Sequence, residues 1–258
     1  MDEKITVGSK LNIESMIDQI KVFATPPYLY FKRWYYYLQG HRGVGDPLRI
    51  YYVRPEDIQY TIGSTSFTDP PGAFEIKAGD WDLNKRPAKD SGKLSMFKKH
   101  FEESIPWKET EEYQRKQNQI EERTVRTLDV ETQSANVYDE YLEYMDVLYE
   151  RIENEGYKKQ HELSADNDFA KRRIHPALNE IQLMIGRNGE LICSTGFHRL
   201  AIVKIQNIPE IPVRTQCRHL HWQRIRDELY STASEEKVSA QANKYIGHPE
   251  LSDITNTV

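Results

Sequence analysis

The sequence predicts an α+β protein in which a mixed β-sheet packs against helices. Three observations predict this fold class. Short β-rich runs recur along the chain, and apolar residues between them repeat at helical spacing. Residues 181–217 read in order as strand, hairpin, strand, glycine turn, helix and strand. A chain of 258 residues has room for one such domain with added segments.

Composition excludes several classes of protein. The 16 Tyr, 8 Phe and 4 Trp residues argue against general disorder, and the net charge of −5 does not favour non-specific binding to nucleic acid. No apolar run reaches the roughly 20 residues of a membrane-spanning helix, and residues 1–10 lack the apolar core of a signal peptide. Cys193 and Cys217 alone make neither a disulfide framework nor a zinc site. We therefore expect a cytoplasmic protein.

Residues 1–45 are predicted to form an N-terminal helical and aromatic segment. Apolar residues over 11–23 recur at helical spacing, and a Pro-Pro pair ends that helix. Residues 28–37 then hold seven aromatic side chains together with Lys32 and Arg33. Two interpretations stay open for them: an amphipathic helix packed on the body of the protein, which we favour, or a peripheral contact with a membrane surface.

Residues 46–225 are predicted to form the main domain, with residues 226–258 as a C-terminal tail. In its first half, the β-rich runs predict strands over 48–53, 58–62 and 74–76, and the periodic runs predict helices over 95–101, 110–126 and 131–154. The helices over 110–126 and 131–154 form an insertion over about 109–160, which we interpret as a cap over the functional site.

The most informative stretch is residues 181–217. Its expected elements are strands over 181–185 and 191–193, a helix over 198–206 and a strand over 211–217. The first two strands are joined by a turn at Asn188 and Gly189, because this dipeptide tolerates positive φ at both central positions of a hairpin turn.

The turn at Gly196 is a candidate phosphate site. A strand that opens directly into a helix presents free backbone N–H groups, and the helix dipole adds positive potential there. Gly196 lets a ligand approach the backbone closely, and Ser194 and Thr195 add hydroxyl donors. Arg199, which follows His198 in the first helical turn, can bind a phosphate with two hydrogen bonds. The alternative is an ordinary strand-to-helix connection with an exposed arginine.

The order of elements and the residues of this stretch together resemble the ParB/sulfiredoxin-like fold, which includes ParB partition proteins, sulfiredoxin and the free-serine kinases of archaea. Their shared pattern is a hairpin, a Gly-x-[His/Arg]-Arg turn, a helix and an Ile-Pro-Val strand. This chain reads IQLMIGRNGELICSTGFHRLAIVKIQNIPEIPVRTQCRH. The whole sequence also resembles archaeal ParB-like proteins, through GDWD at 79–82, IPW at 105–107 and RHLHWQ at 218–223.

The resemblance implies a nucleotide site at Thr195, Gly196, His198 and Arg199. The nucleotide is ATP or ADP in the kinase-like members, where it serves phosphoryl transfer, and CTP in ParB, where it works a clamp. Kinase-like members carry an Asp, a magnesium ligand, where this chain has Thr195.

Two further departures narrow the function that the resemblance implies. Phe197 replaces the reactive Cys of sulfiredoxin, so reduction of sulfinic acids is not expected. ParB continues into a helix-turn-helix domain, and the 35 residues that follow Gln223 are too few for it.

Asp80 and Asp82 are the candidates for catalysis and for Mg²⁺, with His198 as a third catalytic candidate. The two aspartates flank Trp81 directly after a strand-like segment, and paired carboxylates can hold Mg²⁺ and orient an acceptor hydroxyl. They would replace the family Asp that Thr195 displaces. The alternative is a solvated acidic turn with Trp81 as a packing anchor.

Two functions are carried forward. The first is a nucleotide-dependent phosphotransferase, a kinase that acts on a small hydroxyl-bearing acceptor. The second is a nucleotide-responsive module that contacts another protein or nucleic acid through Lys/Arg clusters; nucleic acid is the disfavoured partner, given the net charge.

Overall fold

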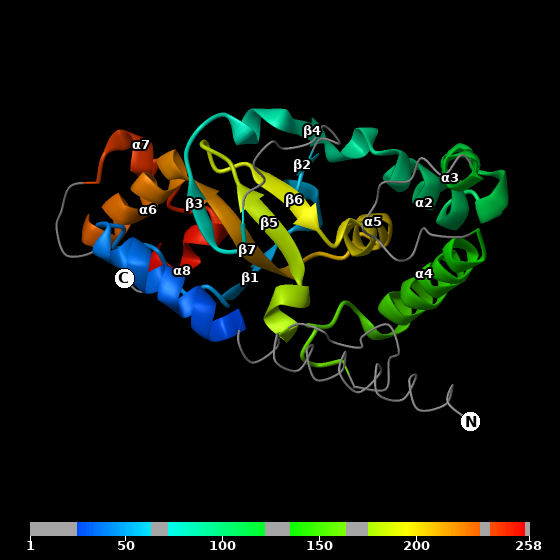
Figure 1. Ribbon diagram of the computed structural model, residues 1–258, viewed down its shortest axis with the longest axis horizontal. Coiled ribbons are helices and arrows are strands. Elements are labelled where there is room, and N and C mark those ends of the chain that lie inside the picture. Colours follow the sequence, from blue (N-terminus) through cyan, green and yellow to red (C-terminus); the bar gives the residue numbers. More distant parts are fainter. Residues whose placement is uncertain (1–24, 63–71, 122–134, 164–174, 233–237, 256–258) are drawn as a thin grey trace, which may run out of the picture.

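The computed structural model describes residues 25–62, 72–121, 135–163, 175–232 and 238–255. In this part of the chain, seven strands form one open mixed sheet with helices packed against it (Figure 1). The predicted combination of a mixed sheet and helices is confirmed at this level. The helix expected over 11–23 lies outside the described residues.

The sheet is built around β7, which pairs along both of its edges. The strand order is β1-β7-β5-β6-β2-β4, and β3 pairs with the end of β7 beyond β1. Pairs β1–β7, β5–β6 and β2–β4 are antiparallel, whereas β5–β7, β2–β6 and β3–β7 are parallel. The strands are β1 (Ile50–Val53), β2 (Tyr60–Ile62), β3 (Glu75–Lys77), β4 (Lys85–Pro87), β5 (Ile181–Ile185), β6 (Leu191–Thr195) and β7 (Ile211–His219).

Helices lie on both sides of the sheet (Figure 1). One group is α2 (Gly92–Phe101), α3 (Glu111–Glu121), α4 (Ala135–Glu155) and α5 (Phe197–Ile205); the other is the helix over residues 25–38, α6 (Leu220–Thr232), α7 (Ala240–Asn243) and α8 (Ser252–Thr255). Short 3-10 turns are Pro55–Asp57, Trp81–Asn84, Ala88–Asp90, Trp107–Glu109, Pro176–Asn179 and Pro249–Leu251. Because it is covered on both faces, β7 is buried at every position except Gln216.

The predicted β5–β6 hairpin is present, but its turn differs from the expected one. Gly189 has a φ of 80°, whereas Asn188 does not have a positive φ. The Gly189 N–H donates to the carbonyl of Gly186 at 3.1 Å, and the Gly186 N–H donates to the carbonyl of Glu190 at 3.0 Å. The expectation of positive φ at both central positions was therefore wrong: one residue in the left-handed region closes this loop.

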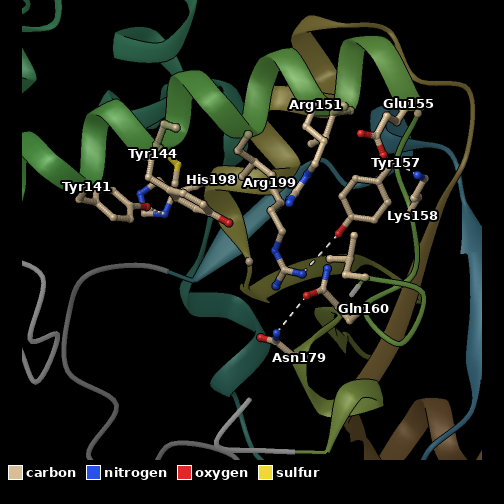
Figure 2. A pocket seen from close by; sticks show the side chains of 16 residues that line it. Tyr141, Tyr144, Arg151, Glu155, Tyr157, Lys158, Gln160, Asn179, His198 and Arg199 are labelled. Atoms are coloured by element: carbon tan, nitrogen blue, oxygen red, sulfur yellow. Dashed lines mark hydrogen bonds and ion pairs between the residues drawn. The ribbon is translucent and has the colours of Figure 1, made fainter. Parts of the chain in front are cut away.

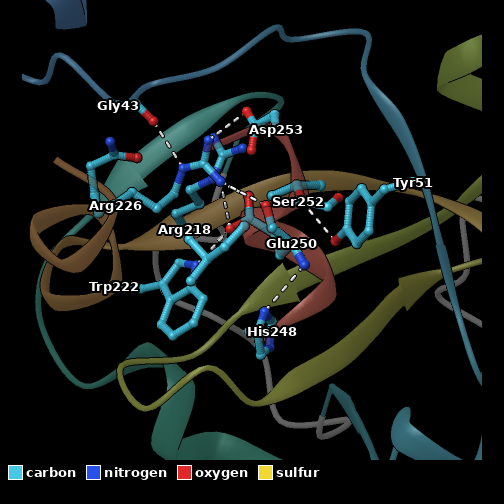
Figure 3. A network of polar contacts seen from close by, with 12 residues as sticks. Gly43, Tyr51, Arg218, Trp222, Arg226, His248, Glu250, Ser252 and Asp253 are labelled. Atoms are coloured by element: carbon cyan, nitrogen blue, oxygen red, sulfur yellow. Dashed lines mark hydrogen bonds and ion pairs between the residues drawn. The ribbon is translucent and has the colours of Figure 1, made fainter. Parts of the chain in front are cut away.

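Residues 226–258 were expected to be a tail, but the expected boundary falls inside α6. The Glu250 carboxylate, which is fully buried, accepts hydrogen bonds from Arg218 Nε at 2.7 Å, Trp222 Nε1 at 2.8 Å and an Arg226 terminal nitrogen at 2.9 Å (Figure 3). Such a buried, fully paired carboxylate ties the segment that carries it to β7 and α6. The described residues after 225 are thus part of the folded body.

The helix over residues 25–38 packs on the body through one side. Leu29 is fully buried and Tyr36 is partly buried, and both contact a small cluster that contains Val44 and Phe74. The expected packing of this segment is therefore observed on that side. Its other side is exposed.

Candidate anion-binding pocket

The turn between β6 and α5 is shaped by Gly196. Its φ of 80° lies in the left-handed region, and a Cβ there would lie 3.0 Å from Ile181 Cγ1. Gly196 is the N-cap residue of α5 and has no side chain that could cap the helix. Among the described residues, no side chain accepts from the N–H groups of the first turn, and the helix dipole adds to their attraction for an anion.

Helix α4 covers this turn and closes a pocket over it (Figure 2). The pocket has a volume of about 250 Å³, and the residues used below that line it are Tyr144, Arg151, Glu155, Tyr157, Gln160 and Arg199. Gly196 and His198 form its floor at the turn. The predicted helical insertion thus supplies one wall of the pocket at the predicted turn.

The pocket carries an excess of positive charge. Arg199 donates to the Tyr157 hydroxyl at 3.5 Å. Neither Arg199 nor Arg151 makes an ion pair with a carboxylate of the described chain. Burial raises the pKa of Tyr157, so its hydroxyl stays neutral. Glu155 is the acidic residue of the lining, and Lys158 pairs with it at 2.5 Å. Two guanidinium groups therefore remain available to an anion.

His198 faces the pocket but is held as a neutral ring. Its Nδ1 hydrogen-bonds to the Tyr141 hydroxyl, and its ring stacks on Phe97 with centroids 5.7 Å apart. Burial, with the nearby charges of Lys93 and Arg199, lowers the pKa of His198 to about 3. A neutral imidazole adds no positive charge at a phosphate. Because Nδ1 already bonds to the Tyr141 hydroxyl, this nitrogen is not free for the predicted catalytic role.

Ser194 and Thr195 do not contribute as expected. The Ser194 hydroxyl donates to the backbone carbonyl of Gln182 on β5 at 3.0 Å, which is a contact within the sheet. Thr195 is exposed, and neither residue lines the pocket. The hydroxyl donors predicted from the sequence are therefore replaced by tyrosines from α4 and from the segment that follows it.

Asp80 and Asp82 lie elsewhere. Arg187 in the hairpin turn donates to Asp82 through Nε at 2.9 Å and to Asp80 through a terminal nitrogen at 2.8 Å. That turn follows the end of β5, whereas Gly196 lies beside its first residue, so a five-residue strand of roughly 16 Å separates them. The expectation that these aspartates join the phosphate site was wrong.

The two aspartates also do not fit a Mg²⁺ ion. Asp82 is 1% exposed, and both of its oxygens accept from Arg187, whose hydrogen bonds keep the pKa of that carboxyl below its ordinary value despite the opposing effect of burial. The described part of the chain contains no cluster of three or more His, Cys, Asp or Glu side chains that could hold a metal ion. The Asp-Trp-Asp turn is therefore a salt-bridged corner of the fold.

One charged group near the pocket was missed in the sequence. Glu180 is 1% exposed, accepts from the Gln160 N–H at 2.7 Å through one oxygen, and has no hydrogen-bond partner for the other among the described residues. Burial raises the pKa of Glu180 to about 7, against the opposing charge of Arg199. Its position directly before an apolar strand is the only signal that the sequence offered.

Fold and pocket together define an α/β protein with a cationic pocket at a strand-to-helix turn. Comparison with protein-family models, with curated proteins and with solved structures gives no significant match. Within the described residues, no helix is both long enough and apolar enough to span a bilayer.

Proposed function

We propose that the pocket between α4 and α5 binds the phosphate groups of a nucleotide, with ATP or ADP as the first candidates and CTP as the alternative. One observation carries the proposal: Arg199, which makes no ion pair with a described carboxylate, lies directly beside the N-terminus of α5, whose first-turn N–H groups have no side-chain acceptor among the described residues. A Cβ on Gly196 would lie 3.1 Å from a terminal nitrogen of Arg199, so the guanidinium lies beside the turn from which the first-turn N–H groups start.

The size of the pocket indicates how such a ligand would lie. A volume of about 250 Å³ is below the roughly 300–1,000 Å³ of typical ligand sites. The enclosed space suits a phosphate-bearing end with Arg151 and Arg199 on two sides of it, and the base would then extend beyond the enclosed part. This arrangement predicts that the affinity for a nucleotide depends strongly on its phosphates and only weakly on its base.

The finer proposal is phosphoryl transfer to a small hydroxyl-bearing acceptor. Polar, uncharged groups of Tyr144, Gln160 and Asn179 line the rest of the pocket and suit a hydroxylated molecule. Glu155 is the carboxylate available there to orient a hydroxyl, once its contact with Lys158 opens. Any metal would bind mainly through the nucleotide, because the described lining offers one carboxylate.

A second candidate is a nucleotide-responsive module without transfer. The described lining contains one carboxylate, which favours this second candidate. Binding a nucleotide needs cations, whereas phosphoryl transfer also needs a general base. A phosphate held between α4 and α5 would fix the position of α4, and through α4 the surface that it presents to a partner.

The experiment is thermal unfolding with pyrophosphate, ATP, ADP, CTP and GTP, with and without Mg²⁺. A ligand at a hundredfold its Kd adds about 2.7 kcal/mol, a rise of about 5–10 °C for a chain of this size. We expect the rise in wild type and in the control Arg224→Ala, an exposed arginine on α6, but not in Arg199→Ala. An equal rise in Arg199→Ala, or none with any ligand, would contradict the proposal.

Two further readouts separate the candidates. Nucleotide hydrolysis or transfer that depends on an added polyol, sugar or amino acid would favour the phosphotransferase. Binding without turnover, together with nucleotide-dependent and salt-sensitive retention on DNA, would favour the module.

A further inference from the structure

The helix over residues 25–38 presents an unusually apolar face to solvent. Its exposed side chains have exposed fractions between 41% and 60%; they are Tyr28, Tyr30, Phe31, Trp34, Tyr35, Tyr37 and Leu38. The helix lies at the periphery of the molecule, outside the sheet (Figure 1). A contiguous exposed patch of large apolar side chains marks a surface that binds something.

The patch has a defined border. At about 100° per residue, the seven exposed positions share roughly half of the helix circumference. Buried Leu29 and partly buried Tyr36 mark the middle of the opposite half, and Lys32 and Arg33 fall on the two edges between them. The exposed half therefore contains no charged residue, and each of its edges carries one cation, of which Lys32 also donates to the Ala73 carbonyl at 2.9 Å.

The local charge is positive in an acidic protein. Residues 25–45 contain Lys32, Arg33 and Arg42 but no Asp or Glu, whereas the whole chain has a net charge of −5. Asp46, which follows directly, accepts a hydrogen bond from the Tyr30 hydroxyl at 3.2 Å, so three cations and one carboxylate lie at this helix. Arg42 lies over the Tyr37 ring at 4.1 Å, so its cation belongs to the same surface. An anionic surface would attract this helix and repel the acidic remainder of the molecule.

We propose that this helix binds in the plane of an anionic lipid bilayer. Trp and Tyr are the side chains that favour the boundary between headgroups and acyl chains, and flanking Lys and Arg reach the lipid phosphates. A second copy of the chain is a poorer occupant, because pairing two such faces would bring their bordering cations together. The inference is independent of the nucleotide proposal, since the two sites share no residue.

Trp34 makes the proposal directly measurable. The other three tryptophans, Trp81, Trp107 and Trp222, are at most 8% exposed, so Trp34 dominates the solvent-accessible tryptophan signal. With vesicles of phosphatidylcholine that contain phosphatidylglycerol, we expect a blue shift of emission and quenching by brominated lipid. Vesicles of phosphatidylcholine alone should give a weaker response, and added salt should reduce binding.

Co-sedimentation with the same vesicles supplies the matched variants. Phe31→Ser should weaken binding roughly tenfold or more, whereas Tyr230→Ser, an aromatic on α6 that is 53% exposed against 60% for Phe31, should leave it unchanged. Circular dichroism and the thermal midpoint confirm that each variant folds. No association of wild type with either vesicle overturns the proposal. So does a dimer in light scattering that Phe31→Ser dissociates, because the face would then be an interface between copies.

Discussion

Replacing Glu250 by Gln tests whether the buried network of Figure 3 holds the C-terminal elements to the sheet. The carboxylate is fully buried between Arg218 and Arg226, whose side chains are 5% and 0% exposed. Gln keeps the shape but removes the charge, which leaves two buried guanidinium groups with Asp253 as the remaining acidic partner of Arg226. Removing one member of a buried ion pair costs about 3–5 kcal/mol.

The pKa of Glu250 gives a second estimate of the same quantity. Arg218 and Arg226 lower it to about 2 from an ordinary value near 4.5, against the opposing effect of burial. Each unit is worth about 1.4 kcal/mol, so the ionised carboxylate contributes about 3 kcal/mol. A depressed pKa stabilises the fold fully above the unfolded value, near pH 4.5, and the contribution is lost as the pH falls toward 2.

Urea unfolding at two pH values measures this contribution. At pH 7 we expect Glu250→Gln to lower the free energy of unfolding by about 3 kcal/mol, and at pH 3 by about 1 kcal/mol. Glu56→Gln, an exposed carboxylate beside Arg54, is the control and should change stability by less than about 0.5 kcal/mol. A loss below about 1 kcal/mol at pH 7, or an equal loss at both pH values, would refute the reasoning.

Three other substitutions probe the pocket and its surroundings. In urea titrations, Glu180→Gln should raise the free energy of unfolding by up to about 3 kcal/mol at pH 8 and leave it unchanged near pH 4. The pKa of Glu180 is raised to about 7, so its ionisation above that pH destabilises the folded state. Equal effects at both pH values would contradict this. Gly196→Ala should cost about 1–3 kcal/mol and weaken pyrophosphate binding in calorimetry, since the left-handed φ and the contact with Ile181 both oppose a Cβ; an unchanged thermal midpoint would count against it. Asp82→Asn should lower the thermal midpoint but leave the pyrophosphate Kd unchanged, because Asp82 lies at the far end of β5; a Mg²⁺-dependent loss of affinity would restore it to the site.

The elements over 181–219 followed from the sequence because their signals are local. An apolar run, a glycine turn, a second run and a helix of apolar residues each specify their own conformation, and all three predicted strands and the helix are found within two residues of their expected ends. The helices over 110–126 and 131–154 are interpreted from the sequence as a cap over the site, and α4 lines the pocket at the turn.

The sequence predictions that were wrong concern features that depend on long-range pairing or on buried charge. Asp80 and Asp82 were assigned to the turn by chemistry alone, and nothing local showed that Arg187 would hold them at the opposite end of the hairpin. Helix α6 was missed because buried polar side chains such as Gln223 and Arg226 hide its apolar period. The contacts that bury them come from residues far away in the chain.

The central claim is that a phosphate group binds at the first turn of α5, and amide NMR tests it most directly. Pyrophosphate should shift the backbone N–H resonances of Phe197, His198 and Arg199 together, with one saturating affinity, and Arg224→Ala should behave as wild type. In Arg199→Ala the shifts should need a much higher concentration. Saturable binding that leaves the Phe197 and His198 amides unmoved, or the absence of saturable binding, would contradict the account.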